Sequence, residues 1–156
     1  MKIEIDQSGK IEQTNLNTII ALSNDIKYSI ILKKRTKRTL QELFRKRGKP
    51  RMFIYQTFAA LIAILIKETK PATKVIIDME YLGHQDILTR QIKDYCEKLS
   101  GKKAVYFTFG FIGKKSAAHT RAEKVAFKKK KADRVIVLSE IVKIIWPIKN
   151  DRVSVC

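Results

Sequence analysis

The spacing of apolar residues predicts three short strands at the start of the chain. Residues 2–6 alternate polar and apolar side chains, and residues 18–22 and 28–32 are further apolar runs. Between these runs lie Ser8-Gly9, several asparagines and Asp25, which are residues that favour turns. Consecutive strands joined by short turns pair antiparallel. Residues 2–32 therefore predict a three-stranded antiparallel meander.

Beyond residue 32 the apolar residues change to helical spacing. From Thr39 to Gly48 they fall on one helical face. A second helix is predicted from Pro50 to about Lys67, because proline fits the first turn of a helix. Its apolar residues cover more than one stripe, so we expect it to be packed on most sides. The apolar run 52–66 is shorter than the ~20 residues of a membrane span, which favours a buried helix.

The rest of the chain alternates strands and helices. Strands are expected at 74–80 and 104–112, and helices at 85–99 and 116–131. A short strand or extended link at 135–138 and a last helix ending before Pro147 follow. Because strand–helix–strand units form parallel pairs, the whole order predicts an α/β fold. Its centre is a mixed five-stranded sheet flanked by helices, at residues 1–135, with a C-terminal helical appendage and tail at 136–156.

The composition points to a polyanionic partner. The 156 residues include 33 Lys and Arg against 15 Asp and Glu, a formal charge of +18. Nucleic acid is the favoured partner, an anionic membrane surface the lesser alternative, and a charge that serves only solubility or a structural ribonucleoprotein also stays open. Basic residues crowd two stretches and are expected to neutralise phosphates. The predicted contacts are Lys33, Lys34, Arg35, Lys37, Arg38, Arg45, Lys46, Arg47, Lys49, Lys114, Lys115, Lys128, Lys129, Lys130 and Lys131.

The cysteines favour a reducing, cytoplasmic setting. Cys96 and Cys156 lack partners at metal-ligand spacing and do not make a disulfide framework. Cys96 falls in a helical pattern and is predicted to be a small buried hydrophobe. The chain starts directly with a strand and shows no secretory leader, and we expect no membrane attachment.

Two of the predicted strands end in carboxylates. Strand alternation places Glu4 and Asp6 on one face of the first, and Asp78 and Glu80 on one face of the other. An acid on the inner face of a sheet is costly unless it is paired or bound to metal. In so basic a protein, a divalent cation held against phosphate is the economical role. The alternatives are that Asp78 and Glu80 cap the next helix or pair with lysines.

A histidine and an acid form a third candidate element. His119 and Glu123 are four residues apart, hence neighbours on one helix face. They either take part in a site or form a solvated pair. No zinc-binding cysteine set, dinucleotide fingerprint or nucleophile elbow is present, and Ser8 has no evident base partner. Covalent catalysis is therefore poorly supported.

The order of elements and the turn Asp6-Gln7-Ser8-Gly9 resemble the ribonuclease H-like superfamily of nucleases and Holliday-junction resolvases. The resemblance implies that the first and fourth strands lie side by side and that acids at their ends hold Mg²⁺ or Mn²⁺. It makes Asp6, Asp78 and Glu80 metal ligands, with His119 or Glu123 completing the set or handling a proton. The chain departs from the resolvase pattern at Ala122, where an aspartate is usual, and its second helix lacks the common glutamate.

We therefore expect a metal-dependent endonuclease acting on DNA or RNA. The alternative is a non-catalytic nucleic-acid-binding or ribonucleoprotein component of the same fold. The resemblance adds two hints, a selectivity for branched or otherwise structured substrates and a homodimer. The predicted catalytic residues are Asp6, Asp78, Glu80, His119 and Glu123, of which Asp6, Asp78, Glu80 and Glu123 are also predicted metal ligands.

Overall fold

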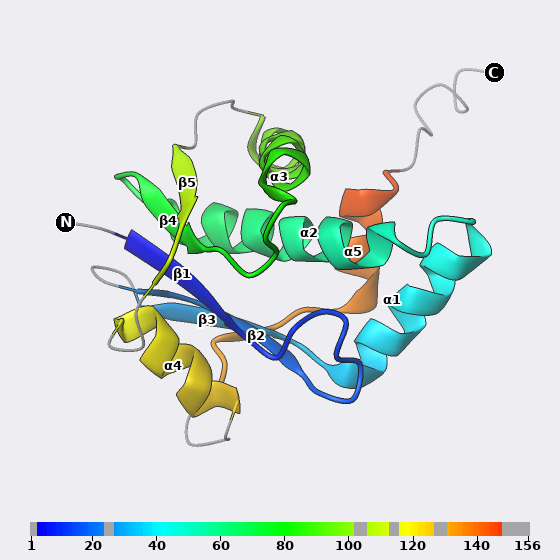
Figure 1. Ribbon diagram of the computed structural model, residues 1–156, viewed down its shortest axis with the longest axis horizontal. Helices are drawn as coiled ribbons and strands as arrows, with labels where there is room; N and C mark the ends of the chain where they lie inside the picture. Colours follow the sequence, from blue (N-terminus) through cyan, green and yellow to red (C-terminus); the bar gives the residue numbers. More distant parts are fainter. Residues whose placement is uncertain (1–2, 24–26, 102–105, 113–115, 127–130, 148–156) are drawn as a thin grey trace.

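The computed structural model describes residues 3–23, 27–101, 106–112, 116–126 and 131–147, which form one mixed sheet with helices on both faces (Figure 1). The strands are β1 (Ile3–Ser8), β2 (Thr18–Ser23), β3 (Tyr28–Leu32), β4 (Val75–Asp78), β5 (Phe107–Gly110) and β6 (Arg134–Val135). The helices are α1 (Lys34–Lys46), α2 (Met52–Thr69), α3 (Gln85–Ser100), α4 (Ala117–Ala126) and α5 (Leu138–Ile145).

The sheet has the strand order β5-β4-β1-β2-β3-β6. Strands β1, β2 and β3 pair antiparallel, which confirms the predicted meander. β4 pairs parallel with β1 on one side and with β5 on the other, and the short β6 adds a sixth, parallel strand beside β3. The predicted α/β fold with a mixed sheet is confirmed. Because β1 and β4 run parallel as neighbours, their carboxyl ends meet at one edge of the sheet.

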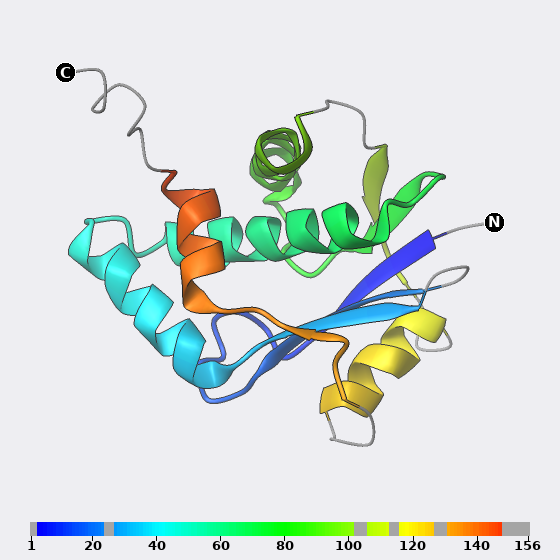
Figure 2. The ribbon, with the colours of Figure 1, turned by 180° about the vertical axis from the view of Figure 1, so that it is seen from behind.

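The sheet separates two apolar layers. On one face, side chains such as Ile5 and Leu22 join the main core with α2. On the other face, Ile19 and Ala21 pack with residues of α4. Figure 2 shows the same arrangement from behind, with α2 and α4 on opposite sides of the strands. Strand β2 is buried along its whole length because helices cover it on both sides.

Helix α2 is the centre of the larger layer. It is long and apolar enough to cross a membrane by length and composition, but 61% of it is buried inside the protein. It packs against the sheet, α1, α3 and α5. A helix that is apolar on most sides needs such surroundings. The prediction of a buried helix is confirmed, and Cys96 on the neighbouring α3 is buried as expected.

The C-terminal helix α5 shares the main core. Ile141, Ile144 and Ile145 are buried in it together with Ile136. The ring of Trp146, directly after α5, lies 4.7 Å from that of Phe44 at the end of α1. The segment 136–147 therefore packs on the same core as the sheet.

One prediction about the basic residues is wrong. Helix α1 begins at Lys34, earlier than the predicted Thr39, and this places Lys37 on the buried side of the helix with Leu40. Lys37 is 0% exposed, and its Nζ donates hydrogen bonds to the carbonyl oxygens of Lys10 (2.9 Å), Gln13 (2.8 Å) and Leu16 (2.8 Å). It therefore fixes the loop between β1 and β2 and cannot reach a phosphate.

The charge of Lys37 survives its burial at neutral pH. Burial lowers its pKa to about 8, while the nearby carboxylate of Glu12 opposes the shift. An ammonium has three protons and no acceptor site, which matches three carbonyl acceptors. The loop is thus attached to α1 by a group that satisfies all of its hydrogen bonds.

Replacing Lys37 with methionine is expected to destabilise the protein. The substitution keeps an unbranched side chain but leaves three carbonyls without a donor, which should lower the free energy of unfolding by about 2–5 kcal/mol. Urea unfolding measures the change. The control is Lys46→Met, an exposed position on the same helix, where a change within about 0.5 kcal/mol is expected. Equal effects of the two substitutions would contradict the role assigned to Lys37.

Candidate metal centre

The parallel pairing of β1 and β4 brings three acids together. Asp6 lies in β1, Asp78 is the last residue of β4, and Glu80 follows two residues later. One carboxylate oxygen from each lies within 4.8 Å of the others. Two oxygens on opposite sides of a Mg²⁺ ion are about 4 Å apart, so this spacing is close to that of a shared cation. We call Asp6, Asp78 and Glu80 the acidic cluster.

Asp6 is held in place from two sides. Its side chain points to the face of the sheet covered by α4, away from the core that contains Ile3 and Ile5. Only 4% of Asp6 is exposed, and its Oδ1 accepts a hydrogen bond from the amide of Gln7 (2.8 Å). Burial raises the pKa of Asp6, and the charge of Asp78 adds to this, while the Gln7 amide and His119 lower it.

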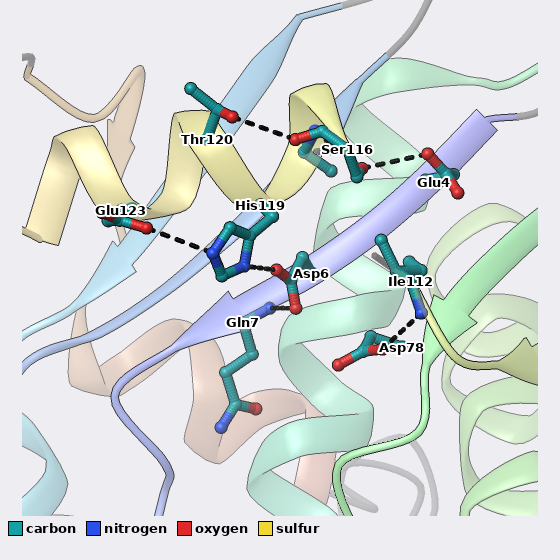
Figure 3. A network of polar contacts seen from close by, with 10 residues as sticks. Glu4, Asp6, Gln7, Asp78, Ile112, Ser116, His119, Thr120 and Glu123 are labelled. Carbon is teal, nitrogen blue, oxygen red and sulfur yellow. Dashed lines mark hydrogen bonds and ion pairs between the residues drawn. The ribbon is translucent and has the colours of Figure 1, made fainter. Parts of the chain in front are cut away.

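Asp78 is fixed by the loop that follows β5. The amide of Ile112 donates to its Oδ1 at 2.9 Å (Figure 3). One residue further along, the amide of Met79 donates to the carbonyl of Gly110 at 2.9 Å. The β4–β5 pairing therefore continues past the end of the strand and sets the orientation of the Asp78 carboxylate.

Glu80 carries the clearest sign of electrostatic crowding. Burial raises its pKa to about 7, and a hydrogen bond shared with Asp78 and the charges of Asp78 and Asp6 act in the same direction. The ammonium of Lys10 opposes them. Near neutral pH the acidic cluster thus retains a proton. A bound cation would take its place, because both relieve the same repulsion.

The residues present fit a divalent metal ion. Their ligand atoms are carboxylate oxygens, which hard cations prefer. In the described part of the chain, no Lys or Arg forms an ion pair with Asp78 or Glu80, so the predicted lysine pairing is not found there. The N-cap position of α3 is His84, and no side chain caps that helix. Within the described residues neither alternative role accounts for these two acids, whereas a cation would compensate their charge.

His119 lies between two carboxylates (Figure 3). Its Nδ1 is 2.7 Å from Oδ2 of Asp6, and its Nε2 is 3.1 Å from Oε2 of Glu123. An imidazolium can donate to both at once, whereas a neutral ring donates to only one. Glu123, predicted as a further metal ligand, contacts the ring of His119 and is not part of the acidic cluster.

Other supports of the site were not predicted. The hydroxyl of Tyr81 accepts from the amide of Ile11 and from Nε2 of Gln7, both at 3.2 Å. On the other side of β1, the hydroxyl of Ser116 donates to Glu4 at 2.9 Å. These contacts join residues about 70 and 112 positions apart, so no local pattern in the sequence indicates them.

The other predicted nucleic-acid contacts differ in their availability. Arg45 pairs with Glu42, and the guanidinium of Arg47 lies 4.2 Å from the centre of the Trp146 ring. Five predicted lysines fall outside the described residues: Lys114, Lys115, Lys128, Lys129 and Lys130. The side chains of the remaining predicted contacts are exposed, namely Lys33, Lys34, Arg35, Arg38, Lys46, Lys49 and Lys131.

Comparisons of the chain with protein-family profiles, curated proteins and solved structures gave no significant match. The ribonuclease H-like resemblance therefore stays a prediction. What the structure establishes is the mixed α/β sheet and the convergence of three acids at its β1–β4 junction.

A divalent cation is expected to bind the acidic cluster. Titration with Mn²⁺ in a calorimeter should give one saturable site, and Asp78→Asn should weaken it about 10–100-fold because a direct ligand is lost. Asp94→Asn removes an exposed acid from α3 and serves as the matched control, with affinity unchanged. Equal Mn²⁺ affinity of the wild type and Asp78→Asn would exclude the cluster as the site.

Stability without metal should depend on pH through Glu80. Its pKa is about 7 in the folded protein against an ordinary 4.5, so between these values the folded state holds a proton that the unfolded state releases. Stability should therefore fall as pH rises through this window, by up to about 3 kcal/mol. Urea unfolding in EDTA at pH 5 and pH 8 measures this loss.

Glu80→Gln removes the titrating group, so we expect this variant to lose less stability than the wild type between the two pH values. The matched control is Glu97→Gln, an exposed position on α3, which should follow the wild type. If Glu80→Gln lost as much stability as the wild type between the two pH values, the inference that Glu80 has a raised pKa in the acidic cluster would be wrong.

Proposed function

We propose that the protein is a divalent-metal-dependent nuclease of the ribonuclease H-like type, acting on DNA or RNA with Mg²⁺ or Mn²⁺. The observation that carries the proposal is the convergence of Asp6, Asp78 and Glu80 within 4.8 Å of one another in a chain of net charge +18. A cation-binding acidic centre on a polycationic protein suits a substrate whose own charge is negative. Phosphodiester is such a substrate.

The three acids would hold the cation through their carboxylate oxygens. A bound Mg²⁺ or Mn²⁺ supplies activation of water and stabilisation of charge on the scissile phosphate. His119 contributes a proton carrier beside the centre, since its Nδ1 contacts Asp6 and its Nε2 contacts Glu123. The two carboxylates orient the ring, and Glu123, which is exposed, can exchange protons with solvent.

The first turn of α1 supports a polyanionic ligand. Lys34 and Arg35 are exposed there, the turn contains no acidic residue, and the exposed Arg38 follows it directly. The amino-terminal end of a helix carries partial positive charge, so cations at this end destabilise the helix while anions stabilise it. A bound phosphate would satisfy both the side chains and the helix end.

A second candidate function is nucleic-acid binding without cleavage. All of α2 is described, and its sole acid is Glu68 near the end of the helix, where it pairs with Arg134. This helix therefore adds no fourth carboxylate to the acidic cluster. A centre with three acids, one of them paired with His119, could hold a cation for structure alone.

Cleavage assays separate the two candidates. Branched, duplex and single-stranded DNA and RNA are incubated with the wild type in Mg²⁺ or Mn²⁺, and we expect cutting of at least one substrate. Asp78→Asn should lower the cleavage rate about 100-fold or more, because it removes a metal ligand, while affinity measured in EDTA stays within about threefold. Asp94→Asn is the matched control and should cut like the wild type. Tight binding by a wild type that cuts none of the substrates with either ion would refute the nuclease and leave the binding protein.

A further inference from the structure

Helix α4 borders a pocket on the side that does not face the acidic cluster. Its Ala122 and Val125 face the sheet, and His119 contacts both Asp6 of the acidic cluster and Glu123. On another side of the helix, residues spaced at three and four positions line a pocket of about 350 Å³ together with the end of β2 and the residue before β3. We call this the α4 pocket, and it is lined by Ser23, Lys27, Ala117, Thr120, Arg121 and Lys124.

Two buried polar groups in the α4 pocket have no hydrogen-bond partner among the described residues. They are the hydroxyl of Ser23, which is 1% exposed, and Nε of Arg121, which is 8% exposed. A buried donor without a partner costs free energy, and most such groups in native proteins are satisfied. Both residues line the pocket, so a small shift of either side chain would bring these groups to a ligand with acceptor oxygens.

The guanidinium of Arg121 is positioned for such a ligand. Its Nη2 donates to Oδ2 of Asp133 at 2.7 Å, and the same oxygen accepts from the amide of Ser29 at 2.7 Å. This contact fixes the plane of the guanidinium, while Nε has no partner among the described residues. Arginine held in this way is suited to phosphate, because its donors are arranged in a rigid fork.

The charge of the α4 pocket favours an anion. Of the described residues that line it, Lys27, Arg121 and Lys124 are cationic and none is acidic, and Arg121 also pairs with Asp133. Ala117 is the first residue of α4, so the positive end of the helix dipole borders the pocket. The residue paired with Ser23 on the neighbouring strand β1 is an acid, Glu4. Its carboxylate accepts a hydrogen bond from the hydroxyl of Ser116. The volume holds a phosphate group with some water, since each water occupies about 30 Å³.

We infer that the α4 pocket binds a backbone phosphate of a nucleic-acid strand. That the phosphate belongs to a nucleic acid rests on the proposed function. A strand crossing α4 is then held at two places, with one phosphate in the pocket and another at the acidic cluster on the opposite flank of the same helix. Contacts of this kind position a strand without reading its sequence. The α4 pocket would thus set which phosphodiester lies at the metal centre.

Oligonucleotide binding by the full chain in EDTA tests the inference, with fluorescence anisotropy as the readout at several salt concentrations. The double variant Lys27→Ala, Lys124→Ala should bind about tenfold more weakly and lower the slope of log K against log salt by about 1, as the loss of one phosphate contact requires. The matched control removes two exposed cations from α3, Arg90→Ala and Lys93→Ala, and should lose less than about threefold with little change in slope.

Ser23→Ala separates the pocket from general charge. It alters no charge, so it should leave the slope unchanged and still weaken binding about three- to tenfold through the lost hydrogen bond. Thermal unfolding of each variant shows whether it is folded, and the exposed lysine positions place no demand on the core. If the double variant matches its control and Ser23→Ala binds like the wild type, the inference is overturned.

Inorganic phosphate distinguishes the source of the ligand. At ionic strength matched with chloride, phosphate should raise the Tm of the wild type more than that of Lys27→Ala, Lys124→Ala. If phosphate does so but all variants bind oligonucleotide alike, the pocket takes a free phosphate compound and the nucleic-acid inference fails. Because these measurements need neither metal nor cleavage, a wild type that binds through the pocket but never cuts contradicts the nuclease proposal alone.

Discussion

Repulsion among three carboxylates is the constraint around which the rest of the structure is arranged. Asp6, Asp78 and Glu80 meet where two parallel strands end, and burial together with the nearby Asp78 and Asp6 raises the pKa of Glu80 to about 7. Among the described residues, His119 pairs with Asp6, and the backbone amides of Gln7 and Ile112 donate hydrogen bonds to Asp6 and Asp78. Such an arrangement is costly to fold without a cation and well suited to bind one.

Contacts between segments that are distant in the sequence keep the ligands of the acidic cluster in place. Lys37 and Tyr81 attach the β1–β2 loop to α1 and to the chain that leaves β4. Ser116, just before α4, contacts Glu4, and His119 on α4 contacts Asp6, so one helix is tied to β1 twice. The acidic cluster therefore sits on rigid elements, which is what a site requires if its ligands are to keep their geometry when a cation or substrate arrives.

Much of the fold could be predicted because strong periodicities decide it. The meander, the buried helix α2 and the parallel β4 follow from apolar spacing, and the facing of Asp6 and Asp78 follows from strand alternation. The start of α1 could not be predicted, because a run of cations is an unfavourable beginning for a helix and the packing of Lys37 and Leu40 outweighs it. The available signal for the earlier start was the spacing of Lys37, which lies three residues before Leu40 and seven before Phe44, on the buried side of the helix.

The acidic cluster was predictable as a set of residues, but its supports were not. The contacts of Tyr81 with Ile11 and of Arg121 with Asp133 depend on how distant segments of the chain meet. Neither Tyr81 nor Arg121 stands out in the sequence. The α4 pocket could not be predicted either. Ser23 is the last residue of a strand and Arg121 lies two residues after His119, and no local pattern links the two. The sequence shows where the charged residues of this protein are, whereas tertiary packing decides which of them are structural and which face a ligand.

The most direct measurement is X-ray diffraction from crystals grown with Mn²⁺, collected at a wavelength where manganese scatters anomalously. We expect an anomalous peak within about 2.3 Å of oxygens from Asp6, Asp78 and Glu80. A crystal grown in saturating Mn²⁺ that shows no peak there, or whose carboxylates turn toward lysines, would contradict the proposed metal centre.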